Sequence, residues 1–174
     1  RPVFADAKLH DIPNTVQRAA SRIAAAGARW VTVHAAGGAE MMEAACTGMG
    51  GDGVLAVTVL TSMDDPGLSA IGVEGPMLKH VLRLAGLAVS SGVEGAVSSP
   101  GEARSIKSTY PELTLFTPGV RPEGVARDDQ RRVTTPSAAI EAGADYVVIG
   151  RPITRAPDAG VAAREIASSI TRIA

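Results

Sequence analysis

The 174-residue sequence is poor in cysteine, in aromatic residues and in net charge. Its one cysteine, Cys46, excludes an internal disulfide and lacks the paired spacing of a zinc site, so we expect a reducing, cytoplasmic setting. The 17 Lys and Arg residues offset 18 Asp and Glu residues, and this balance argues against nucleic acid or an anionic membrane as a partner. Apolar runs are far shorter than the roughly 18 residues of a membrane span, so we expect neither a transmembrane segment nor an export signal.

Short β-branched runs alternate with helical stretches along the whole chain, which is typical of a parallel sheet built from βα units. Helix start signals lie at Asn14 and Thr15, at Ser99-Pro100-Gly101-Glu102, at Thr135-Pro136 and at Asp158. Six strands are predicted, at residues 2–5, 30–33, 54–59, 95–97, 113–116 and 146–149.

This pattern fits either an open doubly wound sheet or a closed eight-stranded barrel. The first strand is not followed by a G-x-G-x-x-G turn, which favours the barrel, and we interpret the glycine-rich run at residues 48–53 as a simple turn. Six units of about 29 residues fill the chain, whereas a closed barrel has eight units and typically about 250 residues. We therefore expect residues 1–174 to be a single α/β domain, a (β/α)8 TIM barrel that lacks its first two βα units.

The densest group of chemically useful residues follows the first predicted strand. Asp6 and Lys8 should point to the same side of an extended chain, about 6.6 Å apart, and Asp11 adds a third charge nearby. Charges at the end of a barrel strand are expensive to bury unless they pair or meet a ligand, so the cluster indicates a functional site. The alternative is a solvated loop with an incidental Asp–Lys pair.

Two further groups suggest that the ligand is an anion. The connection of about 18 residues that begins at Thr117 carries Arg121, Gln130 and Arg131, which suit a binding loop, although a disordered loop is the alternative. After the last strand, the backbone and guanidinium at Gly150 and Arg151 would form a phosphate cradle. Thr61 follows the third strand and could hold a ligand amide, whereas His34 could line the site or be structural.

With these groups in view, the sequence resembles the orotidine 5′-phosphate decarboxylase family over essentially its whole length. The D-x-K-x-x-D pattern is shared across the wider suprafamily, and its extension through Thr15 is more specific to the decarboxylase. The matching segments, in order, are Asp6-Ala7-Lys8-Leu9-His10-Asp11-Ile12-Pro13-Asn14-Thr15, Thr58-Val59-Leu60-Thr61-Ser62-Met63, Thr117-Pro118-Gly119-Val120-Arg121-Pro122, Asp129-Gln130-Arg131-Arg132 and Ile149-Gly150-Arg151-Pro152.

The resemblance implies a lyase that converts orotidine 5′-monophosphate (OMP) to UMP and carbon dioxide in pyrimidine biosynthesis, without a cofactor or metal. It implies that Lys8 protonates C6 of the pyrimidine and that Asp6 lies near the substrate carboxylate. In a homodimer, Asp11 and Thr15 would serve the partner subunit's site. The remaining implied contacts are Thr61 with the pyrimidine, Gln130 with base and phosphate, and Arg121, Gly150 and Arg151 with phosphate.

The family also uses an Asp after its first strand and a Lys after its second, and both positions would precede Arg1. We therefore expect residues 1–174 alone to be inactive. Three alternatives remain open at this point: a metal-dependent sugar-phosphate decarboxylase or synthase of the same suprafamily, a Schiff-base aldolase using Lys8, and an inactive barrel that binds UMP-like phosphates.

Overall fold

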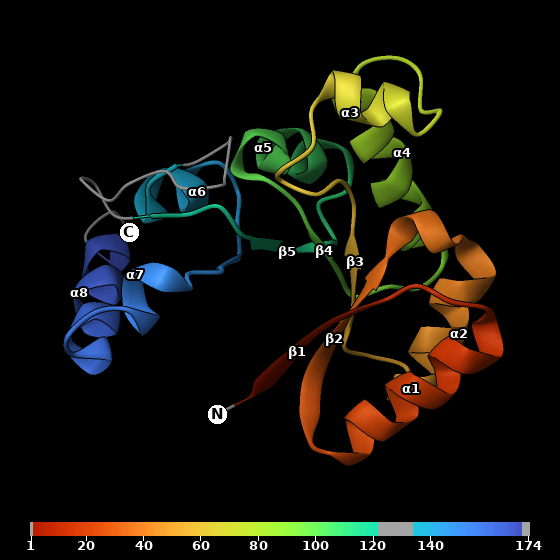
Figure 1. The fold of residues 1–174 in the computed structure, drawn as a ribbon, viewed down its shortest axis with the longest axis horizontal. Helices are drawn as coiled ribbons and strands as arrows, with labels where there is room; N and C mark the ends of the chain where they lie inside the picture. Colours follow the sequence, from red (N-terminus) through yellow and green to blue (C-terminus); the bar gives the residue numbers. More distant parts are fainter. Residues whose placement is uncertain (1, 122–133, 172–174) are drawn as a thin grey trace.

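The computed structural model describes residues 2–121 and 134–171, and its centre is one parallel sheet in which the strands follow their sequence order (Figure 1). All six strands predicted from the sequence are present. They are β1 (Val3–Leu9), β2 (Ala28–His34), β3 (Val54–Val57), β4 (Gly95–Val97), β5 (Thr114–Thr117) and β6 (Tyr146–Val147).

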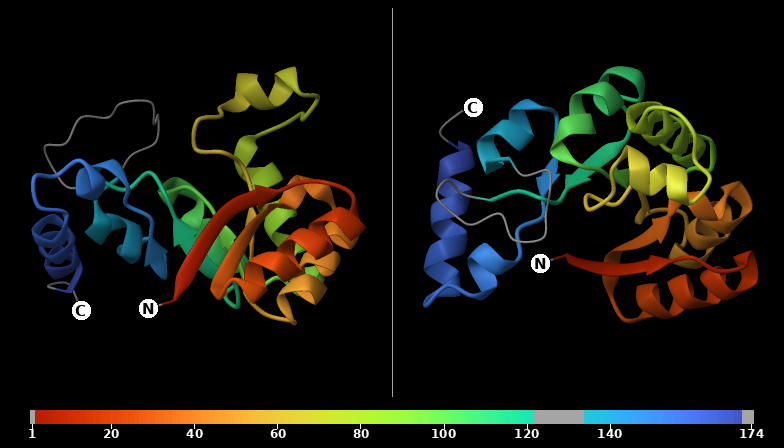
Figure 2. Two further views of the ribbon diagram at one scale, coloured as in Figure 1. Left: turned by 60° about the horizontal axis from the view of Figure 1, so that its bottom comes forward. Right: turned by 45° about the horizontal axis from the view of Figure 1, so that its top comes forward.

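Helical segments connect successive strands, two more follow the last strand, and the helices lie on the outer side of the sheet (Figure 2). The described segments are α1 (Pro13–Ala25), η1 (Ala35–Gly37), α2 (Ala39–Met49), α3 (Asp65–Ala70), α4 (Met77–Ser90), α5 (Pro100–Thr109), α6 (Pro136–Glu141), α7 (Arg151–Thr154) and α8 (Ala159–Thr171). In the described part of the chain, every helix falls short of the length and apolar character that crossing a membrane requires.

Local sequence explains most of the helix starts. Ser99 and Glu102 form the predicted capping box, in which the Ser99 N–H donates to the Glu102 carboxylate at 2.9 Å. The Thr135 side chain caps α6, also as predicted. The prediction for α1 is wrong: the N-cap is Ile12 without a side-chain cap, because Pro13 at the first helical position presets the backbone dihedral and Asn14 and Thr15 lie inside the helix.

The core lies between the sheet and its helices. All four residues of β3 are buried, as expected for a central parallel strand that is covered on both faces. Val31 and Val33 of β2 are also fully buried, and they pair in register with Val54 and Ala56 of β3. Burial of these apolar side chains supplies the main driving force for folding.

Four of the chain's few aromatic rings gather on the inner side of the sheet. Phe4 of β1 stacks on Phe116 of β5 with ring centroids 5.5 Å apart, although three strands separate β1 from β5 in the sheet order. Phe116 also stacks on Tyr146 of β6 at 4.5 Å, and Trp30 of β2 meets Phe116 edge-on at 5.2 Å. Such contacts require a strongly curled sheet, which both views of Figure 2 show.

Several strand boundaries differ from the prediction: β2 begins two residues earlier and ends one residue later, β5 is shifted by one residue, and three larger differences lie at the carboxyl ends of other strands. β1 continues to Leu9 rather than ending at residue 5, so Asp6 and Lys8 lie within a strand. β3 ends at Val57 and β6 at Val147, both two residues before the predicted ends. Thr58 and Val59, which were predicted to extend β3, are buried, but they lie beyond the last pair of the ladder with β4, Val57 with Val97. Their apolar surroundings come from packing rather than from strand pairing.

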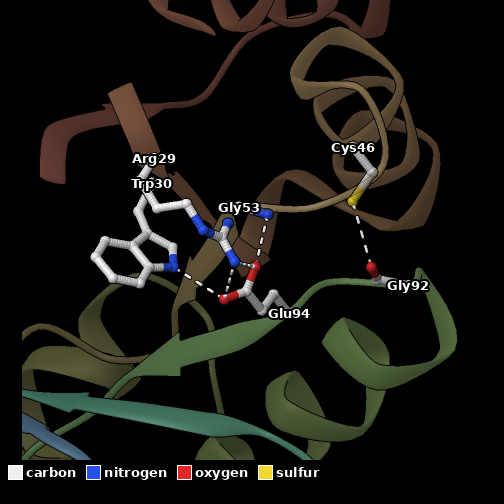
Figure 3. Close-up of polar contacts among 6 residues, drawn as sticks. All are labelled: Arg29, Trp30, Cys46, Gly53, Gly92 and Glu94. Carbon is white, nitrogen blue, oxygen red and sulfur yellow. Dashed lines mark hydrogen bonds and ion pairs between the residues drawn. The ribbon is translucent and has the colours of Figure 1, made fainter. Parts of the chain in front are cut away.

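At the amino-terminal edge of the sheet, Glu94 joins three strands (Figure 3). Its carboxylate accepts hydrogen bonds from Trp30 Nε1 at 2.9 Å and from the Gly53 N–H at 2.8 Å, and it pairs with Arg29 Nη2 at 2.9 Å. Gly53 ends the glycine-rich turn predicted from the sequence; its φ is 87°, and a Cβ there would lie 2.3 Å from the Arg29 carbonyl oxygen.

Candidate active site

A cavity of about 250 Å³ opens at the carboxyl ends of the strands, on the inner side of the curled sheet. Active sites of parallel α/β folds form at this edge. Its lining residues come from β1 and from the ends of β3, β4, β5 and β6: Phe4, Asp6, Lys8, Val57, Val59, Leu60, Thr61, Val97, Ser98, Pro118 and Val148. The lining is largely apolar, with one charged pair and two hydroxyl groups.

The charged pair consists of Asp6 and Lys8, whose side chains lie on the same side of β1, as the sequence predicted. Lys8 Nζ is 2.5 Å from Asp6 Oδ2, and the two side chains are 40% and 49% exposed. A pair this exposed contributes under about 1 kcal/mol to stability. An ammonium group held beside a carboxylate in a cavity can, however, meet an anionic ligand and donate a proton to it.

Thr32 of β2 forms hydrogen bonds with both members of this pair. The Lys8 N–H donates to Thr32 Oγ1 at 2.8 Å, and Thr32 Oγ1 donates to Asp6 Oδ1 at 2.9 Å. Lys8 has a φ of 49°, the one positive φ of a non-glycine residue in the described chain, and the pairing of β1 with β2 shifts register between Ala5 and Leu9. Sequence reasoning missed Thr32, because a Thr between two valines is typical of any buried strand.

His34 ends β2 beside the charged pair, and its ring lies 5.5 Å from that of His10. Burial lowers the pKa of His34, and the nearby His10 and Lys8 lower it further, whereas Asp6 acts in the opposite direction. In the described chain, His34 does not line the cavity.

A buried hydroxyl in the cavity was also missed. Ser98 follows β4, is 1% exposed, and its Oγ has no hydrogen-bond partner among the described residues. A buried hydroxyl without a partner costs free energy unless a ligand satisfies it. The one signal for this residue in the sequence is weak, namely a hydroxyl directly after a predicted strand.

The remaining predicted residues divide into two groups. Thr61 lines the cavity together with Asp6 and Lys8. Asp11 and Thr15 are exposed beyond the end of β1, where Asp11 Oδ1 accepts from the Ile12 N–H at 2.7 Å and Thr15 lies in the first turn of α1. In the described chain, neither of these two residues lines the cavity.

The predicted anion-binding residues lie near two other strand ends. Arg121 is 5% exposed, and its N–H donates to the Thr134 carbonyl at 2.9 Å, so the two described ends of the long connection are joined. Gln130 and Arg131 lie outside the described residues. Gly150 and Arg151 begin α7, directly after Val148 and Ile149.

Among residues 2–121 and 134–171, no group of three or more His, Cys, Asp or Glu side chains is arranged to hold a metal ion.

Comparison with known proteins places this geometry in a family. Residues 1–166 match the model of the "Orotidine 5'-phosphate decarboxylase / HUMPS family". Orotidine 5'-phosphate decarboxylase of Anaeromyxobacter sp. (strain K) is 55% identical over 172 residues, which cover 98% of this chain and 76% of that protein. The protein of the same name from Thermobifida fusca (strain YX) is 52% identical over 171 residues, covering 98% of this chain and 73% of that protein.

A solved structure agrees with these matches. The crystal structure of orotidine 5'-phosphate decarboxylase from Lactobacillus acidophilus superposes with a TM-score of 0.85 at 36% sequence identity, over 97% of this chain and 75% of that one. The chain thus spans about three quarters of the length of these relatives. The matched residues, the sequence identity and the parallel curled sheet agree, and the chain therefore belongs to the orotidine 5′-phosphate decarboxylase / HUMPS family.

Proposed function

We propose that this protein decarboxylates OMP to UMP and carbon dioxide, as the names of its relatives indicate. The observation that carries the proposal is the Lys8 ammonium, held by Asp6 in a cavity at the carboxyl edge of the sheet of a chain from this family. This reaction belongs to pyrimidine nucleotide biosynthesis.

In the proposed reaction, the bond between pyrimidine C6 and the carboxylate carbon breaks and its electron pair stays on C6. The Lys8 ammonium then donates a proton to C6, and carbon dioxide leaves. A cation that is already in place where the negative charge develops stabilises the transition state without reorganisation. Asp6 fixes the ammonium by its contact with Nζ, and no cofactor is required in this scheme.

The other residues are assigned by their places around the cavity. Thr61 and the partnerless hydroxyl of Ser98 face the cavity and would hydrogen-bond the polar edge of the pyrimidine. Gly150 and Arg151, after β6, would bind the phosphate, as would Arg121. Gln130 would bridge the base and the phosphate. Binding at the remote phosphate can be used to raise the rate at C6.

The proposal also covers the assembly. Among the described strands, β1 and β6 each pair on one side only, and two further βα units between them would close a (β/α)8 barrel of which residues 1–174 form part of a single domain. The exposed Asp11 and Thr15 would reach the partner subunit's site in a cytoplasmic homodimer.

The experiment replaces Lys8 with Ala in a fusion of residues 1–174 to the two N-terminal βα units of the Anaeromyxobacter relative. Absorbance follows the conversion of OMP to UMP. We expect at least a roughly 10³-fold loss of kcat, with UMP affinity changed less than about tenfold. Lys79→Ala, at an exposed position of α4, is the matched control and should leave both values unchanged. Undiminished turnover in Lys8→Ala would refute the proposal, and turnover of a sugar phosphate that is lost on chelation would replace it with a different activity.

Residues 1–174 are assayed alone and after fusion to the two N-terminal βα units of the Anaeromyxobacter relative. We expect UMP binding by both proteins and efficient decarboxylation only by the fusion, which would then serve for the kinetic comparisons. Equal turnover by both proteins would contradict the expectation that residues outside this chain complete the charge network.

A further inference from the structure

We propose that Thr32 is a positioning residue for the Asp6–Lys8 pair. This inference rests on the proposed function, because it concerns the groups that would carry out the decarboxylation. Thr32 lies in the middle of β2, is 0% exposed and does not line the cavity in the described chain, so it acts through its neighbours rather than by contact with the substrate.

The geometry is a closed ring of three polar contacts. The Lys8 N–H donates to Thr32 Oγ1 at 2.8 Å, Thr32 Oγ1 donates to Asp6 Oδ1 at 2.9 Å, and Lys8 Nζ contacts Asp6 Oδ2 at 2.5 Å. A hydroxyl has a single proton. Since a carboxylate only accepts and an N–H only donates, the direction of both Thr32 hydrogen bonds is fixed.

The ring explains how Lys8 keeps its unusual backbone. A φ of 49° is disfavoured for a residue with a Cβ, and such conformations persist where the surrounding structure enforces them. Between Ala5 and Leu9 the ladder with β2 is irregular, and there the buried Thr32 hydroxyl takes up the Lys8 N–H. The same oxygen orients the Asp6 carboxylate, so one side chain sets the positions of both charged groups.

Removal of the hydroxyl should therefore displace the proton donor while leaving the binding contacts in place. Small displacements of catalytic groups cost up to about 10²-fold in rate. The expected effect falls on kcat rather than on KM, since Thr61, Ser98 and the phosphate-binding residues do not depend on Thr32. A purely structural role would instead lower stability and leave kcat per folded molecule unchanged.

The test compares Thr32→Val, which keeps the shape without the hydroxyl, with Thr32→Ser, which keeps the hydroxyl. The first readout is hydrogen exchange of the Lys8 amide by NMR in residues 1–174. We expect at least about tenfold faster exchange in Thr32→Val and a change of less than about threefold in Thr32→Ser. The Val31 amide, which donates to the Gly53 carbonyl at 2.8 Å, is the internal control and should not change.

The second readout is turnover of OMP by the fusion protein that carries the two N-terminal βα units. We expect kcat to fall about 10- to 100-fold in Thr32→Val with KM within about threefold, and to recover to within about threefold of wild type in Thr32→Ser. Unchanged Lys8 exchange in Thr32→Val, or equal loss of kcat in both variants, would overturn the inference.

The two hypotheses fail in different ways. Absence of turnover in the fusion protein without substitutions counts against the proposed function, whereas the exchange of the Lys8 amide in residues 1–174 still decides the role of Thr32. If Thr32→Val does not fold, Thr32→Cys takes its place under the same criteria, because a thiol is a weak donor and acceptor of similar volume.

Discussion

Replacement of Glu94 tests how the amino-terminal edge of the sheet is held together. The side chain is 22% exposed and accepts from Trp30 of β2, from Gly53 before β3 and from Arg29 of β2. Burial raises the pKa of Glu94, but the hydrogen bonds from Trp30, Gly53 and Arg29 outweigh burial and hold the pKa below its usual value. The ionised carboxylate is therefore part of the folded structure.

The magnitude follows from the partners that Glu94→Ala would leave behind. The Trp30 and Gly53 N–H groups, both partly buried, would lose their acceptor at about 1–3 kcal/mol each, and the half-exposed pair with Arg29 adds under about 1 kcal/mol. Water at the edge of the sheet offsets part of this cost. We expect Glu94→Ala to lower the free energy of unfolding by about 2–4 kcal/mol and Glu94→Gln by about 1–2 kcal/mol.

Urea unfolding followed by fluorescence measures these values, because Trp30 is the only tryptophan of the chain. Glu74→Ala, at an exposed position, is the control and should stay within about 0.5 kcal/mol of wild type. A loss below about 0.5 kcal/mol in Glu94→Ala would refute the reasoning. The ionised Glu94 should contribute fully above pH 4.5 and less as the pH falls through its lowered pKa, a component that Glu94→Gln should lack.

Three further predictions concern other parts of the chain. The lowered pKa of His34 should appear as an NMR titration midpoint below 6.5, and the free energy of unfolding should decrease as the pH falls through 6.5 toward that midpoint; a midpoint at or above 6.5 contradicts this. Gly95→Ala should cost about 1–3 kcal/mol in urea unfolding, because its Cβ would lie 2.3 Å from the Thr114 carbonyl oxygen, whereas Gly101→Ala, with 3.9 Å to its nearest neighbour, should be nearly neutral; equal effects would refute the steric argument. Burial raises the pKa of Cys46, so iodoacetamide should modify it more slowly in the folded than in the unfolded chain at pH 8, and equal rates would count against this.

Features that depend on neighbours in sequence were predictable. The six strands follow from β-branched runs, the start of α5 follows from Ser99 and Glu102, and the same-side placement of Asp6 and Lys8 follows from the two-residue period of a strand. The strand ends were less predictable, because burial by packing and pairing in the ladder leave the same apolar pattern in the sequence.

Features that depend on contacts between distant residues were missed. Thr32, Ser98 and Glu94 are single polar residues at the middle or the edge of strands, and nothing in their immediate sequence distinguishes them from ordinary strand residues. Their roles arise when β1, β2 and β4 come together in the sheet, which places a hydroxyl or carboxylate next to groups far away in the chain. Such pairings are determined by tertiary structure, which local propensities do not contain.

The stacking of Phe4 on Phe116 also bears on the order of folding. Two rings from the first and fifth strands are separated by most of the chain, and closing so large a loop is unfavourable until the intervening strands have docked. We therefore expect the contact to form late, after the individual βα units. Since Trp30 meets Phe116 edge-on, its indole signal during refolding should follow the completion of curvature rather than the growth of secondary structure.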